Sequence, residues 1–310
     1  MKKALLFSAS ATLVAAVSVF ASDHSSSTRV SQEDSDEDGV EAHGKVVHEL
    51  NPEFGKLRAS RHRTGSGISY HGGPVLVSGV TAYVIWYGNW SGNSATTIIQ
   101  NFLQSEGGSP YFNINSTYYN GSGTHVLNKV TYGGSTTDAY SQGTSLTDAQ
   151  IQAVVSSAIS SGGLPKDPNG VYFVLTSADV TASSGFCTQY CGWHTHATIS
   201  GTDIKYSFVG NPDRCPSACE AQATSPNGNA GADGMVSIIA HELEEAVTDP
   251  DLNAWFDGRG QENADKCAWT FGAVYQAANG SVANMNLGGK DYLIQQNWVN
   301  AGSGYCALKY

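Results

Sequence analysis

Two stretches of β-branched and aromatic residues constrain the fold of this chain more than any other feature. Residues 80–87, Val-Thr-Ala-Tyr-Val-Ile-Trp-Tyr, and residues 171–176, Val-Tyr-Phe-Val-Leu-Thr, each follow a glycine and are apolar nearly throughout. Short runs of this kind are typical of strands that are buried on both faces of a sheet. A third apolar run, residues 75–77, is also expected to form a strand.

Helical patterns separate these strands. Thr147 and Gln150 have the spacing of a capping box, and residues 96–105 predict a short helix. After the capping box, one face of a helix that ends at Gly162-Gly163 is marked by Ile151, Val154, Val155, Ala158 and Ile159. Strands that alternate with helices favour an α/β or α+β fold, with helices packed on a mixed sheet in a single domain.

The first 71 residues have a different composition. Residues 1–21 begin with Met1-Lys2-Lys3, continue with an apolar run and end in a small residue, which is the pattern of a cleaved signal peptide. Residues 22–71 contain an acidic run at 33–38 and almost no periodic apolar pattern, so we expect a disordered tail or a propeptide. The folded domain is therefore predicted to span residues 72–310 of a secreted protein.

Charge limits the partners of the chain. It has 27 acidic and 16 basic residues and a net charge of −11, which argues against nucleic acid and anionic membranes. No segment after residue 21 is apolar enough to cross a bilayer, so we expect no membrane contact after signal cleavage. A secreted glycoprotein would accept glycans at four Asn-x-Ser/Thr sequences, those of Asn89, Asn115, Asn120 and Asn279.

All six cysteines lie in the second half of the chain, at positions 187, 191, 215, 219, 267 and 306. An even number of cysteines behind a signal peptide favours disulfide bonds that stabilise the domain. The sequence leaves their pairing open.

The segment His241-Glu242-Leu243-Glu244-Glu245 carries the strongest chemical signal. In zinc hydrolases a helical His-Glu-x-x-His motif places two ligands on one face, and the Glu after the first His is the general base. Here Glu245 replaces the second histidine, and a carboxylate is also a zinc ligand. The segment therefore predicts a zincin-like site with His241 and Glu245 as ligands. Glu244 is an alternative to Glu245, because residues three apart are also neighbours on a helix.

Glu242 is the predicted catalytic residue. On a helix of about three turns, from Met235 to Val247, it falls within the apolar face, whereas His241 and Glu245 lie at the rim of that face. A carboxylate in an apolar stripe is costly unless it is paired, protonated or near a cation. Partial burial also raises the pKa of a carboxyl group, which suits a general base that takes a proton from metal-activated water.

A third ligand must come from residues after this helix. The candidates are Asp249, Asp251, Asp257, Glu262 and Asp265. Glu262 and Asp265 are preferred because their distance from Glu245 is close to the spacing of thermolysin-like enzymes, whereas Asp251 has the metzincin spacing. Zinc is the expected ion. Calcium is a less favoured alternative, suggested by the many carboxylates.

His194 and His196 alternate along a predicted strand, so both project from the same side. Two imidazoles on one face can bind a metal or act as an acid and an oxyanion stabiliser. Hydrogen-bonded structural histidines are more common, and this interpretation is the preferred one.

Several segments resemble the phosphate-induced protein family, which includes the plant Exordium proteins. In chain order they include Ile85-Trp86-Tyr87-Gly88-Asn89-Trp90, Gly185-Phe186-Cys187, Cys191-Gly192-Trp193-His194, Cys215-Pro216 to Cys219 and Pro226-Asn227-Gly228. The resemblance implies a secreted protein of the cell wall or apoplast, linked to growth and extracellular signalling, with no established reaction. The chain would be a variant of that family that carries a zincin-like His-Glu-x-x-Glu helix.

Two functions are predicted from these observations. The first is a secreted zinc-dependent, peptidase-like hydrolase that acts on an extracellular protein or peptide. The second is a non-enzymatic extracellular module that binds cell-wall polysaccharide or a receptor through its tyrosine and tryptophan side chains.

Overall fold

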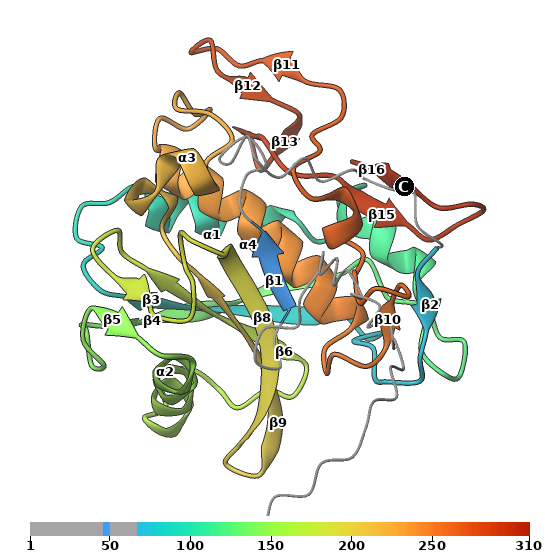
Figure 1. The fold of residues 1–310 in the computed structure, drawn as a ribbon, viewed down its shortest axis with the longest axis horizontal. Helices are drawn as coiled ribbons and strands as arrows, with labels where there is room; N and C mark the ends of the chain where they lie inside the picture. The colour runs from blue at the N-terminus through green and yellow to red at the C-terminus, as the bar shows by residue number, and fades with distance from the viewer. Residues whose placement is uncertain (1–45, 50–66) are drawn as a thin grey trace, which may run out of the picture. The chain divides into compact units, whose positions relative to one another are not determined.

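The computed structural model describes residues 46–49 and 67–310. The predicted signal peptide and most of segment 22–71 lie outside the described residues. The elements, drawn in Figure 1, are in chain order β1 (Val46–Glu49), β2 (Ser69–Tyr70), β3 (Val80–Tyr87), α1 (Ala95–Ser105), η1 (Phe112–Thr117), β4 (Val130–Asp138), β5 (Ser145–Leu146), α2 (Asp148–Ser160), β6 (Gly170–Thr176), β7 (Thr181–Ala182), β8 (Tyr190–Ile199), β9 (Thr202–Val209), η2 (Pro212–Arg214), α3 (Pro216–Cys219), α4 (Ala230–Thr248), β10 (Trp255–Phe256), η3 (Asp265–Cys267), β11 (Tyr275–Gln276), β12 (Val282–Ala283), β13 (Met285–Leu287), β14 (Lys290–Tyr292), β15 (Asn297–Val299) and β16 (Tyr305–Ala307).

Six strands form the central sheet, in the order β1-β8-β9-β6-β3-β4. Strands β4, β3, β6 and β9 pair in parallel, whereas β8 is antiparallel to β9 and β1 is antiparallel to β8. Both apolar stretches predicted from the sequence lie at the centre, as β3 and β6, and every residue of β6 is buried. The mixed α/β class is therefore confirmed. Strand β1 falls within the segment 22–71 that the sequence assigns to a tail or propeptide.

Helices cover both faces of this sheet (Figure 1). α2 packs against β6 and β9, and α1 packs against α4, which lies across β8 and β9. The predicted capping box is present: the Gln150 N–H donates to Thr147 Oγ1 at 3.3 Å, and the Thr147 N–H donates to Gln150 Oε1 at 2.8 Å. The predicted helix at residues 96–105 is α1.

α4 is longer than the sequence predicts. It begins at Ala230 instead of Met235, because Asn229 caps it by accepting a hydrogen bond from the Ala232 N–H at 3.0 Å. Gly231 lies inside the helix, where a Cβ would come within 2.4 Å of a side-chain oxygen of η2's cap residue. This glycine therefore permits close packing and does not mark the start of the helix.

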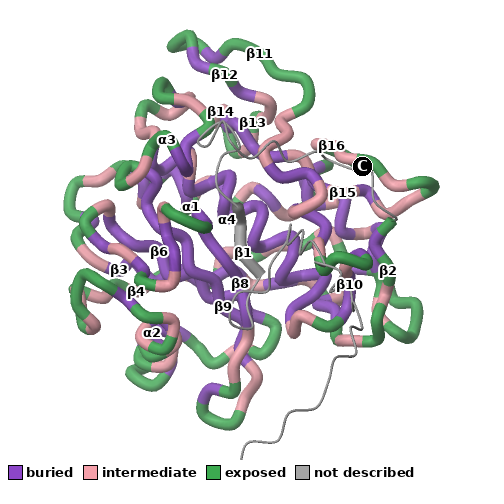
Figure 2. The backbone as a smooth tube through the Cα atoms, viewed as in Figure 1, coloured by how far each residue is buried: buried purple, intermediate pink, exposed green. Residues whose placement is uncertain are grey.

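α4 is also more buried than predicted, along nearly its whole length (Figure 2). The C-terminal segments cover the side that faces away from the sheet. The Gln295 N–H donates to Ser237 Oγ at 3.2 Å, and Asn297 Nδ2 donates to Glu244 Oε2 at 2.5 Å. The prediction that the motif residues lie at the rim of the buried face is wrong, because the sequence pattern of one helix does not reveal a second covering layer.

Three disulfides pair all six cysteines. They join Cys187 to Cys215, Cys191 to Cys219 and Cys267 to Cys306. The first two connect the start of β8 with the segment that leads into α4, and the third ties η3 to β16. The pairing that the sequence left open is thereby assigned.

The predicted strand at residues 75–77 is not a strand in the structure. The Leu76 N–H donates to the Val247 carbonyl at 3.0 Å, and the Val77 carbonyl accepts from the Leu127 N–H at 3.1 Å. Leu76 thus pairs with one of the last carbonyls of α4, which have no partner within the helix. Hydrogen bonding to a helix end replaces the expected sheet pairing.

Replacing Thr147 with alanine should destabilise the domain by about 1 kcal/mol, because the Gln150 amide loses its side-chain acceptor. For a domain of this size, such a loss lowers Tm by about 2–4 °C. Thermal unfolding followed by circular dichroism measures the effect. Ser160→Ala, at the exposed other end of α2, is the matched control and should leave Tm unchanged. Equal melting of Thr147→Ala and the parent chain would contradict the role of the cap.

Candidate metal centre

The predicted motif residues face one another in the folded chain. His241 Nε2 lies 2.9 Å from Glu245 Oε1, one turn further along α4, and 3.4 Å from Asp265 Oδ1. The Asp265 N–H donates to Glu245 Oε1 at 3.0 Å, which holds the start of η3 against the helix. The three side chains are 0%, 0% and 9% exposed. The fold therefore brings two predicted ligands and one of the preferred third ligands to one place.

Strand β8 adds a second histidine. His194 Nδ1 lies 3.3 Å from Glu242 Oε2 and 3.5 Å from Glu245 Oε2, and His194 Nε2 lies 3.6 Å from Glu262 Oε2. The close approach of β8 to α4 requires Gly192, where a Cβ would come within 3.1 Å of the Glu242 carboxylate. His194, which the sequence favoured as a structural residue, therefore lies among the predicted ligands. The alternation of the two histidines was the only sequence signal for it.

The segment after α4 supplies two further acids. Glu262 is 1% exposed and lies against Asp249. One oxygen of Asp249 is already used, because Oδ1 accepts hydrogen bonds from the backbone N–H groups of Asn253 and Ala254, both at 2.6 Å. We use the name buried cluster for the following seven residues: His194, His241, Glu242, Glu245, Asp249, Glu262 and Asp265.

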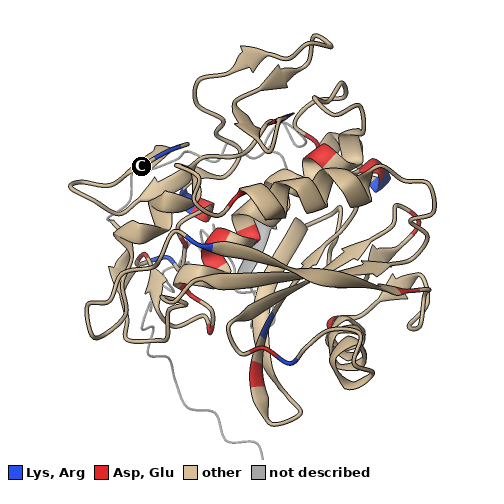
Figure 3. Ribbon diagram, turned by 180° about the vertical axis from the view of Figure 1, so that it is seen from behind, with Lys and Arg blue, Asp and Glu red and all other residues tan. Residues whose placement is uncertain are grey.

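The buried cluster has an excess of negative charge. It contains five carboxylates and two imidazoles, and Figure 3 shows in red the acidic residues that α4 contributes. Among the described residues, no lysine or arginine forms an ion pair with the cluster, and Lys266 pairs instead with Asp257 at 3.0 Å. An uncompensated buried charge costs on the order of several kcal/mol. The arrangement is one that a cation would stabilise.

The pKa values reflect this crowding. Burial raises the pKa of Glu242 to about 7, against the effect of the hydrogen bond from His194. Burial would also raise the pKa of Glu245, but the charge of His241 and the nearness of both imidazoles lower that pKa to about 2. Burial, together with the nearby Glu245 carboxylate, raises the pKa of Glu262 well above its ordinary value. Protons thus neutralise part of the cluster, and metal binding would displace them.

Several buried atoms of the cluster have no hydrogen-bond partner in the part of the chain that the structure describes. They are His194 Nε2, Glu242 Oε1, Glu245 Oε2 and both carboxylate oxygens of Glu262. Buried polar atoms are nearly always satisfied in folded proteins, so each exception requires an explanation. A cation would satisfy imidazole and carboxylate atoms together.

Two of the five acids considered as third ligands lie outside the cluster. Asp257 pairs with a lysine, as described above. Asp251 belongs to a separate, partly exposed group in which its Oδ1 lies 3.7 Å from His196 Nδ1, and Lys205 Nζ lies 2.6 Å from Asp203 Oδ2 and 3.6 Å from Asp251 Oδ1. A lysine already supplies the positive charge there. The metzincin spacing of Asp251 therefore does not bring it to His241.

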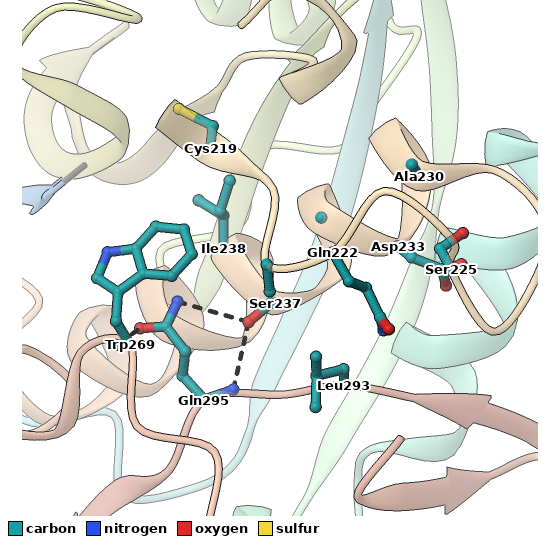
Figure 4. A pocket seen from close by; sticks show the side chains of 12 residues that line it. Cys219, Gln222, Ser225, Ala230, Asp233, Ser237, Ile238, Trp269, Leu293 and Gln295 are labelled. Carbon is teal, nitrogen blue, oxygen red and sulfur yellow. Dashed lines mark hydrogen bonds between the residues drawn. The ribbon is translucent and has the colours of Figure 1, made fainter. Parts of the chain in front are cut away.

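A small hollow of about 20 Å³ lies beside the cluster along α4 (Figure 4). Its lining includes Ser237, Ile238, Trp269 and Gln295, and none of the cluster residues. Ser237 Oγ accepts hydrogen bonds from the N–H and Nε2 of Gln295, at 3.2 and 3.5 Å. Because Ser237 precedes His241 by four residues, it lies on the same stripe of the helix, one turn away. The hollow is therefore adjacent to the cluster.

Comparison with known proteins identifies the family. Residues 68–297 match the conserved region of phosphate-induced protein 1. The chain belongs to this family. Protein EXORDIUM-like 5 of Arabidopsis thaliana is 35% identical over 299 residues, which cover 82% of each chain. Protein EXORDIUM-like 3 of the same plant is 35% identical over 279 residues, 77% of this chain and 82% of the relative. No solved structure matches the chain.

The phosphate-induced protein family and the disulfides agree with an extracellular location. Three disulfides are typical of proteins that fold in an oxidising compartment, and the Exordium-like relatives are consistent with this. Within the described residues, every helix is too short or too polar to span a bilayer. One glycosylation prediction is wrong: Asn115 is 0% exposed and accepts a hydrogen bond from Asn263, so a glycan does not fit there.

Glu244, the alternative to Glu245 as a ligand, faces a different group. Its Oε2 accepts from Asn297, and its carboxyl group lies near Glu106 at the end of α1. Glu106 is 0% exposed, and neither of its carboxylate oxygens has a hydrogen-bond partner among the described residues. Burial raises the pKa of both acids well above the ordinary value of a glutamic acid. At neutral pH these two buried acids therefore lower the free energy of unfolding of the domain.

Glu106→Gln should stabilise the domain increasingly as the pH rises above about 4.3, the pKa of an unfolded glutamic acid. Above that pH the unfolded chain loses the proton that folded Glu106 retains, so the stability of the parent chain falls with rising pH. Glutamine removes this effect. We expect a higher Tm than the parent at pH 8 and an equal Tm at pH 4. Gln104→Glu, an exposed position of the same helix, is the control and should show no such dependence. A gain in Tm that is independent of pH would contradict the explanation.

Proposed function

We propose that this member of the phosphate-induced protein family is an extracellular zinc protein with a metal centre at His241, Glu245 and Asp265. We further propose that it hydrolyses peptide bonds with Glu242 as the general base. The observation that carries the proposal is the charge of the buried cluster, in which carboxylates outnumber imidazoles and have no lysine or arginine partner among the described residues. A divalent cation supplies the missing positive charge.

The separations of the ligand atoms support zinc. Zinc bonds of about 2.0–2.2 Å place neighbouring ligands of a tetrahedral site roughly 3.3–3.6 Å apart. His241 Nε2 lies 3.4 Å from Asp265 Oδ1, and its 2.9 Å distance from Glu245 Oε1 would lengthen slightly around an ion. Imidazole ligands also favour zinc over calcium, which takes about six to eight oxygen ligands.

The surroundings of Glu242 support its role as the base. Its Oε2 contacts His194 Nδ1 at 3.3 Å, whereas its Oε1 has no partner among the described residues and remains available to a water molecule. Burial raises its pKa to about 7, near the pH at which a base must both hold and release a proton. The neighbouring hollow, with Trp269 and Leu293 in its lining, has room for about one water molecule.

A second candidate function is supported by the depth of the cluster. The side chains of His194, His241 and Glu245 are 0% exposed, and closed sites of this kind usually stabilise a fold, whereas catalytic zinc sites keep one position open. In that case the metal would stabilise a non-enzymatic module that binds cell-wall polysaccharide or a receptor.

Metal analysis of the purified secreted chain tests the centre. We expect at least about one zinc per chain after dialysis against metal-free buffer, and a fall in Tm of several degrees in the presence of a chelator, because the ion binds only the folded state. His241→Gln should lose this zinc. Asp251→Asn, in the separate surface group, is the matched control and should retain it. The proposal would be refuted if the purified chain contained no metal and its Tm did not change in the presence of a chelator.

Glu242→Gln separates the reaction from metal binding. The variant should keep the zinc at His241, Glu245 and Asp265, because these ligands are unchanged. It should cleave a fluorogenic peptide library at least about 100-fold more slowly than the parent chain, because the general base is removed. If the parent chain binds zinc and cleaves no peptide, the hydrolase is excluded and the non-enzymatic module is favoured. Binding to a glycan array would then support that alternative.

A further inference from the structure

We propose that the buried cluster holds two divalent cations and that the carboxylate of Glu245 bridges them. The inference rests on the proposed function, because it takes the centre at His241, Glu245 and Asp265 as the first site. The second site is formed by His194, Glu262 and the other oxygen of Glu245. The sequence predicted one ion with Glu262 or Asp265 as its third ligand, whereas the fold places these two acids beside different histidines.

The two oxygens of Glu245 lie beside different imidazoles. Oε1 is 2.9 Å from His241 Nε2, and Oε2 is 3.5 Å from His194 Nδ1. Each histidine has a further acid of its own, since Asp265 Oδ1 lies 3.4 Å from His241 Nε2 and Glu262 Oε2 lies 3.6 Å from His194 Nε2. Within each triad, the ligand atoms lie within 4.8 Å of one another. Bridged metal pairs in proteins are about 3.5–4 Å apart, a span that one carboxylate can bridge.

The second triad contains four of the five atoms of the buried cluster that were named above as lacking a hydrogen-bond partner. His194 Nε2, Glu245 Oε2 and both oxygens of Glu262 have no hydrogen-bond partner among the residues that the structure describes. The three side chains are at most 1% exposed, so bulk water does not satisfy them. An ion bound only at His241, Glu245 Oε1 and Asp265 would leave these atoms unsatisfied. A second ion satisfies them.

The charge of the cluster also favours two ions. Histidines that bind a metal are neutral, so the cluster then presents the negative charges of five carboxylates. One divalent ion would leave three of these charges uncompensated in the interior, and two divalent ions would leave one. Among the described residues, no lysine or arginine pairs with the cluster to balance the remaining negative charge, because Lys205 and Lys266 pair with other acids.

Glu242 fits the second triad as the partner that orients His194. Its Oε2 lies 3.3 Å from His194 Nδ1, so Nδ1–H can donate to the carboxylate and leave the Nε2 lone pair, on the side of Glu262, for a metal. Glu245 Oε2 lies nearer to Nδ1, at 3.5 Å, and would shift toward Nε2 to reach the same ion. Histidines that bind metals commonly donate their other N–H to a carboxylate in this way. Strand β8 therefore presents an imidazole that is already oriented for binding.

Counting ions on the complete parent chain tests the inference without any substitution. After removal of metal, equilibrium dialysis with zinc should saturate at two equivalents per chain, and dialysis with ¹¹³Cd²⁺ should give two cadmium resonances of equal intensity. Saturation at one equivalent with one resonance would overturn the second site and leave the proposed function standing. Absence of bound metal would overturn both.

Substitutions assign each ion to its triad. His194→Gln should bind one zinc per chain and lose one of the two cadmium resonances, and Asp265→Asn should lose the other. Glu245→Gln should weaken both sites together, because it removes the bridge. His196→Gln, two residues further along β8, is the matched control and should retain two ions. If His194→Gln binds as many zinc ions as the parent chain, the second site is wrong, and if this variant does not fold, the cadmium count on the parent chain decides.

Discussion

The burial of α4 on all sides is the constraint on which the rest of the structure depends. The helix lies between the sheet and the C-terminal segments, so its acidic side chains cannot reach water. Each of them must be protonated, hydrogen-bonded or matched by positive charge inside the protein. Glu244 is hydrogen-bonded by Asn297, whereas Glu245 contacts two histidines and Glu242 contacts one. The contacts of these acids with His194 and Asn297 are therefore a consequence of the layered fold.

The parts of the fold that were predicted from the sequence are those with local signals. The stretches that became β3 and β6 contain nearly continuous apolar residues, and the capping box of α2 depends on two residues three positions apart. Residues 75–77 have a similar apolar composition, but their hydrogen bonds depend on where α4 ends, which no local pattern reveals. The length of α4 was underestimated because its glycines serve a contact with η2.

In the candidate site, too, the features with local sequence signals were predictable and those that depend on tertiary contacts were not. The pairing of His241 with Glu245 follows from helix geometry and could be predicted. The choice among the downstream acids could not, because Asp251 and Asp265 differ only in how the chain turns after α4. His194 was undervalued because its role depends on the register of β8 against β9 and on the close approach of β8 to α4 at Gly192. Both features depend on tertiary contacts, which leave no pattern in the sequence.

The disulfide between Cys267 and Cys306 also bears on when the site can form. It ties the segment that carries Glu262 and Asp265 to a strand near the end of the chain, 39 residues further on. The donor atoms thus come from β8, from α4 and from a segment that is fixed in place only once that last strand has been synthesised and the thiols oxidised. At the proposed metal centre, ion binding would therefore follow the synthesis of β16 and the oxidation of the two thiols, and a nascent or reduced chain would not yet have the assembled site.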